Sequence, residues 1–105
     1  MKHQLSHETL DVYRLAVQVA RWVRAARFPV GDADLRDQAR RAAQSMVLNL
    51  AEGCHSLGGN RGKHFRVARG SAAEVCAVLD LVDLPDGDVQ QEAIRRVVAM
   101  LSRLK

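Results

Sequence analysis

Apolar and polar residues alternate with helical spacing in the first part of the chain. Residues 7–27 predict a helix whose polar residues recur three or four positions apart and therefore share one narrow stripe. These polar residues are Asp11, Arg14, Gln18 and Arg21. An apolar heptad seam is formed by Val12, Ala16, Val19, Val23 and Ala26. The pattern is typical of a helix that buries one face in a protein core.

Leu15 and Trp22 extend the apolar surface of this first predicted helix beyond that seam. They are seven positions apart and therefore lie on one flank of the helix. A single seam is sufficient for an internal core, so the second apolar flank needs another surface to cover it. We therefore predict that the chain does not work as a monomer, and that Leu15 and Trp22 contribute to the interface between subunits.

Two further helices are predicted on either side of a glycine-rich segment. The second helix begins at Asp32 or Asp34 and continues to about residue 54, because acidic residues favour the positive N-terminal end of a helix. Four glycines within residues 53–62 indicate a turn. The third helix is expected over residues 63–84, and its apolar seam consists of Phe65, Ala68, Ala72, Val75, Leu79 and Val82.

A turn at residues 84–87 separates this segment from a fourth predicted helix. Asp88 and Gln91 have the spacing of a capping box at its start. Its apolar seam consists of Ile94, Val97, Leu101 and Leu104. Four helices with short connections predict an all-α fold, an up-down-up-down antiparallel four-helix bundle. The length favours a single domain over residues 1–105.

A small group of polar residues interrupts the apolar seams of the second and third helices. If these helices form a hairpin about Gly58-Gly59, Asn49 faces Ser71, and Ser45 faces Glu74. Such a group is either a catalytic cluster or a polar lock that fixes how two helices align. Because no pair of nucleophile and base completes a catalytic site, we interpret these four residues as a structural lock.

Three segments of the sequence resemble a known family. They are LDVYRLA at residues 10–16, RRAAQSMVLNLAEG at residues 40–53 and ARGSAAE at residues 68–74. The chain resembles the small four-helix-bundle proteins encoded in intervening sequences of bacterial large-subunit ribosomal RNA genes, to which the retroelement accessory variability determinant is related. Val47 stands where that family commonly has proline.

The resemblance implies a homopentamer and no enzymatic activity or cofactor. It also implies nucleic-acid binding, which is the activity associated with the retroelement branch. A protein partner such as a reverse transcriptase is compatible with this branch. The apolar first helix independently indicates an oligomer, whereas the number of five subunits comes only from the family.

The distribution of charge gives a separate indication of function. The net charge is +4, and residues 53–73 contain no acidic residue, whereas residues 74–92 contain no basic residue. Arginine is suited to phosphate because its planar guanidinium donates two parallel hydrogen bonds. We therefore predict non-sequence-specific binding of RNA or DNA. The candidate residues are Arg61, Lys63, Arg66 and Arg69, with Arg40 and Arg41 as second choices.

Other functional classes are less compatible with the sequence. The main alternative is a protein-interaction scaffold whose basic end docks an acidic partner, with no nucleic-acid role. His3 and His7 have a spacing that suits a metal on a helix, and Cys54 is expected nearby. His3 precedes the predicted helix, however, and no carboxylate that would orient these histidines can be named, so we predict no metal site. We also predict no small-molecule substrate. The chain has no apolar run long enough for a membrane span and no signal-peptide pattern, so we expect a cytoplasmic protein.

Overall fold

The computed structural model describes residues 7–56 and 58–104, except for the side chains of residues 7 and 8. All regular secondary structure in these ranges is helical. The helices are α1 (His7–Ala25), α2 (Ala33–His55), α3 (Gly59–Leu81) and α4 (Gly87–Arg103). His3 lies outside the described residues.

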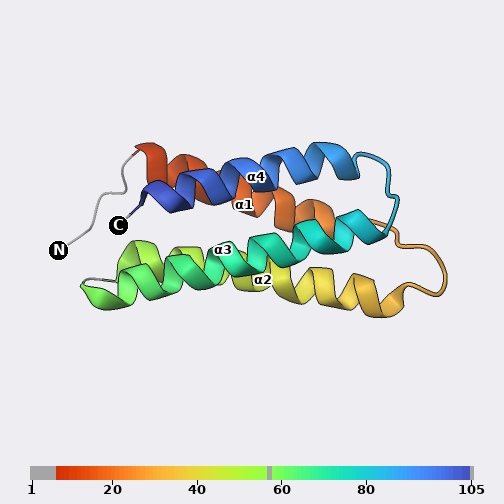
Figure 1. The fold of residues 1–105 in the computed structure, drawn as a ribbon, viewed down its shortest axis with the longest axis horizontal. Helices are drawn as coiled ribbons and strands as arrows, with labels where there is room; N and C mark the ends of the chain where they lie inside the picture. Colours follow the sequence, from red (N-terminus) through yellow and green to blue (C-terminus); the bar gives the residue numbers. More distant parts are fainter. Residues whose placement is uncertain (1–6, 57, 105) are drawn as a thin grey trace.

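Each helix packs against the two helices that are its neighbours in a closed square: α1 against α2 and α4, and α3 against α2 and α4. Figure 1 shows consecutive helices running in opposite directions along a bundle of 48 × 21 × 20 Å. The turn between α2 and α3 and the C-terminal end of α4 lie at one end of the bundle. The other two connections lie at the opposite end. The predicted antiparallel four-helix arrangement is therefore observed.

The core contains most residues of the seams that the sequence predicted for α1, α3 and α4, together with apolar residues of α2. Val12, Ala16, Val19 and Val23 of α1 are fully buried. The opposing helices contribute the buried residues Met46, Leu50, Phe65, Ala68, Ala72, Val75, Ile94, Val97 and Leu101. Small residues predominate where α2 meets α3, and this pair of helices makes the most extensive contact in the bundle. Small side chains allow two helix backbones to approach closely, which explains this contact.

The glycine-rich segment forms a shorter turn than the sequence suggested. α2 continues through Gly53 to His55, and α3 begins at Gly59, four residues before the predicted start. Gly58 precedes α3 with a φ of 75°, a left-handed conformation that favours glycine. Three of the four glycines, Gly53, Gly59 and Gly62, are thus helical residues.

α3 also ends before its predicted last residue. The helix stops at Leu81, and Val82 is extended, although its backbone N–H still donates to the carbonyl of Val78. Val82 and Leu84 are buried, so the connection to α4 continues to cover the core after the helix has ended. The helix was predicted to reach residue 84 because apolar residues continue to that position, but the last of them are buried in the connection rather than in the helix.

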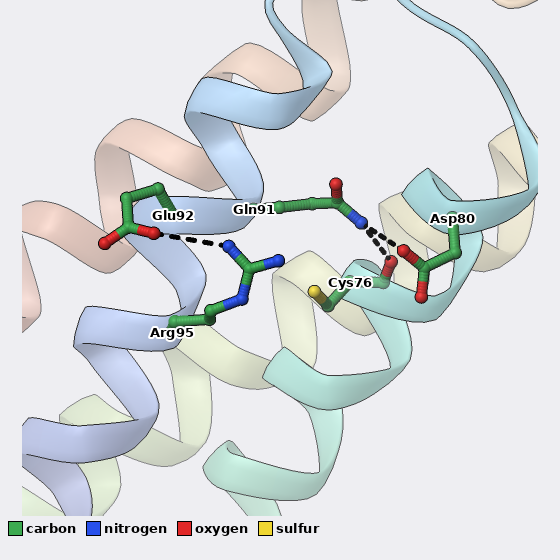
Figure 2. A network of polar contacts seen from close by, with 5 residues as sticks. All are labelled: Cys76, Asp80, Gln91, Glu92 and Arg95. Carbon is green, nitrogen blue, oxygen red and sulfur yellow. Dashed lines mark hydrogen bonds and ion pairs between the residues drawn. The ribbon is translucent and has the colours of Figure 1, made fainter.

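The predicted capping box at the start of α4 is not formed. Asp86 occupies the N-cap position with a φ of 65° and makes no side-chain capping hydrogen bond. The Gln91 side chain instead points to α3, where its amide nitrogen donates to Cys76 O at 3.0 Å and to Asp80 Oδ1 at 2.7 Å (Figure 2). Gln91 therefore joins α3 to α4 and does not cap its own helix.

Among the described helices, none combines the length and the apolar character that a bilayer crossing requires.

Candidate nucleic-acid interface

The first half of α3 carries four of the predicted basic residues in different settings. The side chains of Lys63 and Arg66 are exposed. Arg69 is half-buried, and its Nη1 donates to Ser102 Oγ of α4 at 3.4 Å. Positions three apart on a helix are neighbours on its surface, so Lys63, Arg66 and Arg69 form a continuous basic strip. We call these three residues the α3 strip.

Arg61 differs from the α3 strip because its side chain turns towards the bundle. Its guanidinium lies over the Phe65 ring, 5.1 Å from the ring centroid. Such a cation–π contact keeps the positive charge against a buried aromatic residue. Burial raises the pKa of the neighbouring Cys54 thiol above its ordinary value, and the Arg61 guanidinium partly offsets that shift. Arg61 therefore helps to close this end of the bundle as well as adding charge to it.

Arg40 and Arg41 lie apart from the α3 strip. Arg41 is exposed on α2. Arg40 is half-buried and turns towards α1, where its Nη2 donates to Arg24 O at 3.1 Å. Its Nε is buried and has no hydrogen-bond partner among the described residues. Since Ser45 of α2 pairs with Ser71 of α3, residues 40 and 41 lie beside the second half of α3 rather than the first.

A polar network joins α2 to α3 where the lock was predicted. Ser71 Oγ donates to Ser45 Oγ at 2.8 Å, and the Asn49 amide nitrogen donates to Ser45 O at 3.0 Å and to Ser45 Oγ at 3.2 Å. Asn49 is half-buried and its oxygen contacts His64 Nδ1 at 3.1 Å. The four residues connect two helices through side chains and a backbone carbonyl.

Glu74 is not part of this network, contrary to the prediction. It is exposed on α3, and His64 is the fourth member instead. The physical reason is the shorter turn. α3 begins four residues earlier than predicted, and Ser45 faces Ser71 rather than Glu74, while Asn49 faces His64 rather than Ser71. The signal for His64 was present in the sequence but required the correct alignment of the two helices.

The hydrogen bonds of Asn49 also determine the tautomer of the neutral His64 ring. The amide nitrogen of Asn49 already donates to Ser45, so its oxygen faces His64 as an acceptor. His64 Nδ1 must therefore carry a hydrogen and donate it. The neutral ring then has an unprotonated Nε2. This tautomer is assigned from the network of hydrogen bonds.

We expect Asn49→Ala to reduce the free energy of unfolding by about 1 kcal/mol, because it removes hydrogen bonds of half-buried groups. Chemical denaturation followed by circular dichroism measures the change, and Gln44→Ala at an exposed amide of α2 is the matched control. Nitrogen NMR of the histidine rings should show the Nδ1–H tautomer of His64 in the wild type and a mixture in Asn49→Ala. An unchanged His64 spectrum would contradict the network.

Leu15 and Trp22 occupy one flank of α1, as the spacing predicted. Both side chains are half-buried and pack partly against the core. They also line a groove between α1 and α4 together with Val89 and Ala93. The remaining exposed part of this flank is therefore continuous with an apolar surface of α4.

The histidines give no metal cluster in the described part of the chain. His55 is exposed at the end of α2, and His64 is engaged with Asn49. No three histidine, cysteine, aspartate or glutamate side chains among the described residues are placed to share a metal ion. The side chain of His7 lies outside the described residues.

Most of the chain matches a known protein family. The family described as 23S rRNA-intervening sequence protein matches residues 8–101, which include α2, α3 and most of α1 and α4. The chain belongs to this family. No curated protein matches the sequence at a significant level. The family match reaches into the last turns of α4, although this part carried none of the motifs on which the resemblance rested.

The family assignment also locates the three motifs within the fold. LDVYRLA lies in α1, RRAAQSMVLNLAEG in the second half of α2 and ARGSAAE in α3. The latter two motifs supply Ser45, Asn49 and Ser71 to the polar network. In this intervening sequence protein, the residues that carried the resemblance thus include those that fix how α2 aligns with α3.

Proposed function

We propose that this intervening sequence protein is a non-enzymatic homo-oligomer, a pentamer, that binds RNA or DNA through the phosphate backbone. The observation that carries the proposal is the α3 strip. Lys63 and Arg66 are exposed, Arg69 adjoins them, and no acidic residue occurs between residues 53 and 73. Such a strip attracts a polyanion because its positive charges are not neutralised locally.

Phosphate contact, rather than recognition of bases, fits the residues of this surface. Base recognition in single strands uses aromatic side chains on which bases stack. Phe65, the aromatic residue within the first half of α3, is 3% exposed and belongs to the core. The proposed binding is therefore insensitive to sequence and sensitive to salt.

Oligomerisation increases the proposed affinity because it repeats the strip. Each subunit contributes Lys63, Arg66 and Arg69 from the same end of its bundle. A closed ring of subunits with parallel axes places all the strips near one rim. A phosphate backbone that contacts several strips is held more tightly than one that contacts a single strip. The number of five subunits is carried over from the family resemblance.

A salt titration tests the proposal directly. Fluorescence anisotropy with random-sequence RNA and DNA oligomers measures affinity between about 50 and 200 mM salt, and light scattering measures the mass of the same sample. We expect the logarithm of affinity to fall linearly with the logarithm of salt concentration, with a slope of roughly −0.7 per phosphate contacted on a single strand. Absence of binding at low salt would refute this function and favour a scaffold that docks an acidic protein.

A further inference from the structure

α1 separates two surface grooves of different charge. The groove between α1 and α2 has an apolar floor that includes Val17, Ala20 and Val47. Its charged lining residues are Arg21, Arg24 and Arg40, and no acidic residue occurs among the described residues that line it. We call it the basic groove.

The groove between α1 and α4 lies on the other flank of α1. Its apolar lining includes Leu15, Trp22 and Val89. Its charged lining residues are Asp88, Glu92 and Arg96, of which the two acidic residues lie in the first turns of α4. We call it the acidic groove. Both grooves are apolar at the base and differ in the sign of their charge.

Each groove is bordered by an apolar side chain that is left in solvent. Leu48 of α2, which lines the basic groove, is 54% exposed, and Val89 of α4 is 57% exposed. Single exposed apolar residues are common, but here each adjoins an apolar groove on the same face. Both faces therefore have apolar area that a second surface would cover.

The basic groove also contains an unsatisfied hydrogen-bond donor. Arg40 Nη2 donates to Arg24 O, whereas Arg40 Nε is buried and finds no partner in the part of the chain that the structure describes. A buried donor without an acceptor costs free energy, more so when it belongs to a charged group. A carboxylate that enters the groove would pair with the Arg40 guanidinium and balance its charge. The groove thus favours an acidic partner with an apolar border.

The acidic groove of a second copy has these properties. It presents Asp88 and Glu92 beside the apolar residues Trp22 and Val89. Glu92 is exposed and forms an ion pair with Arg95 on the same helix at 3.3 Å. Such a surface ion pair contributes little free energy, so its loss on binding of another partner costs little. Opposite charges around apolar surfaces favour association and fix the orientation of the partners.

The two grooves also lie at the same level of the bundle. Residues 15, 18 and 22 of α1 line the acidic groove, and residues 17, 20, 21 and 24 line the basic groove. Copies that pair these grooves therefore need rotation about an axis along the bundle and little translation. A head-to-tail contact of this kind closes into a ring, whereas a large translation would produce a filament.

We propose that the basic groove of each subunit receives the acidic groove of the next copy of this chain, with Arg40 facing Glu92 of the neighbouring copy. The inference rests on the homo-oligomer of the proposed function and identifies the two surfaces that meet. Leu15 and Trp22 belong to the acidic side of this contact. Arg40 accordingly belongs to the interface between subunits. Nucleic-acid binding is then a function of the α3 strip and not of Arg40.

Charge exchange tests this pairing. Arg40→Glu and Glu92→Arg each place like charges opposite one another, and we expect each single variant to sediment as a folded monomer. The double variant Arg40→Glu/Glu92→Arg restores opposite charges and should recover the wild-type mass. Arg66→Glu, an equal change of charge outside both grooves, should keep the wild-type mass. Sedimentation equilibrium measures the mass, and circular dichroism verifies the helical fold.

Leu48→Gln provides a second variant in case Arg40→Glu does not fold. Leu48 is exposed, so the substitution should leave the stability of the subunit unchanged and weaken assembly at least tenfold. Wild-type mass for Leu48→Gln and both single charge variants would overturn the pairing, as would folded single variants that are not rescued in the double variant. A monomeric wild type would refute the homo-oligomer itself, whereas nucleic-acid binding by the α3 strip would be judged separately by the salt titration.

Discussion

Gly53→Ala is expected to destabilise the protein by about 1–3 kcal/mol, because the added methyl group overpacks a closed part of the core. A Cβ at position 53 would lie 2.5 Å from Cε1 and 2.7 Å from Cδ1 of Phe65. The Phe65 ring is 3% exposed and has the Arg61 guanidinium on its face, so it has little room to move. The higher helix propensity of alanine, worth up to about 1 kcal/mol, offsets only part of this cost.

Gly70→Ala is the matched control for this prediction. Gly70 lies within α3, is exposed, and has nothing within 4 Å of the position that a Cβ would occupy. Only the propensity term acts there, so we expect Gly70→Ala to stabilise the protein by up to about 1 kcal/mol. Urea denaturation followed by circular dichroism compares the two variants. Phe65→Leu should recover stability in the Gly53→Ala background, and a Gly53→Ala variant as stable as Gly70→Ala would contradict the close approach of α2 to α3.

These two glycines show why the helices could be predicted more reliably than their ends. The period of apolar residues was sufficient to predict most core residues, because the apolar face of a helix is buried wherever the helix begins or ends. Glycine, in contrast, has two meanings in a sequence. Gly58 permits a left-handed turn, whereas Gly53 permits another helix to approach. The two roles are distinguished only by the residue that the glycine contacts. For Gly53 that residue is Phe65, which lies 12 positions further along the chain.

The shortened turn also explains what could be predicted of the polar network. Ser45, Asn49 and Ser71 were identified because polar residues in apolar seams are conspicuous in a sequence. His64 was missed and Glu74 was included because the partner of Ser45 is Ser71, which lies three residues before the predicted Glu74. In an α-helix such a displacement transfers a contact to the next turn. Pairings across helices are therefore harder to predict than the helices that carry them.

The directions of the arginine side chains were not accessible from the sequence either. Arg61, Arg66 and Arg69 belong to one basic segment, but the structure places Arg61 on Phe65 and Arg69 beside Ser102. Arg40 turns to the carbonyl of Arg24 across the groove between α1 and α2. Charge density follows from the sequence, whereas the surface to which each charge contributes depends on packing between helices.

Lys63→Glu/Arg66→Glu is expected to weaken binding of a random RNA or DNA oligomer at least about 100-fold at low salt, because each neutralised phosphate releases counterions that favour association. Both side chains are exposed, so the double variant should keep the stability of the fold. The salt slope should also become shallower by roughly 0.7 for each phosphate contact that is lost on a single strand. Since the substitutions are repeated in every subunit, the loss grows with the number of strips that one strand contacts.

The control for this prediction must change the net charge equally at another place. Arg14→Glu/Arg27→Glu alters two exposed arginines, one of α1 and one of the connection between α1 and α2, away from the α3 strip. If the strip binds phosphate, this control should reduce affinity much less than Lys63→Glu/Arg66→Glu and should retain the wild-type salt slope. Equal losses in the two double variants would show that only the overall charge of the protein matters, because a local contact surface responds to where a charge is placed and a diffuse field responds to the sum.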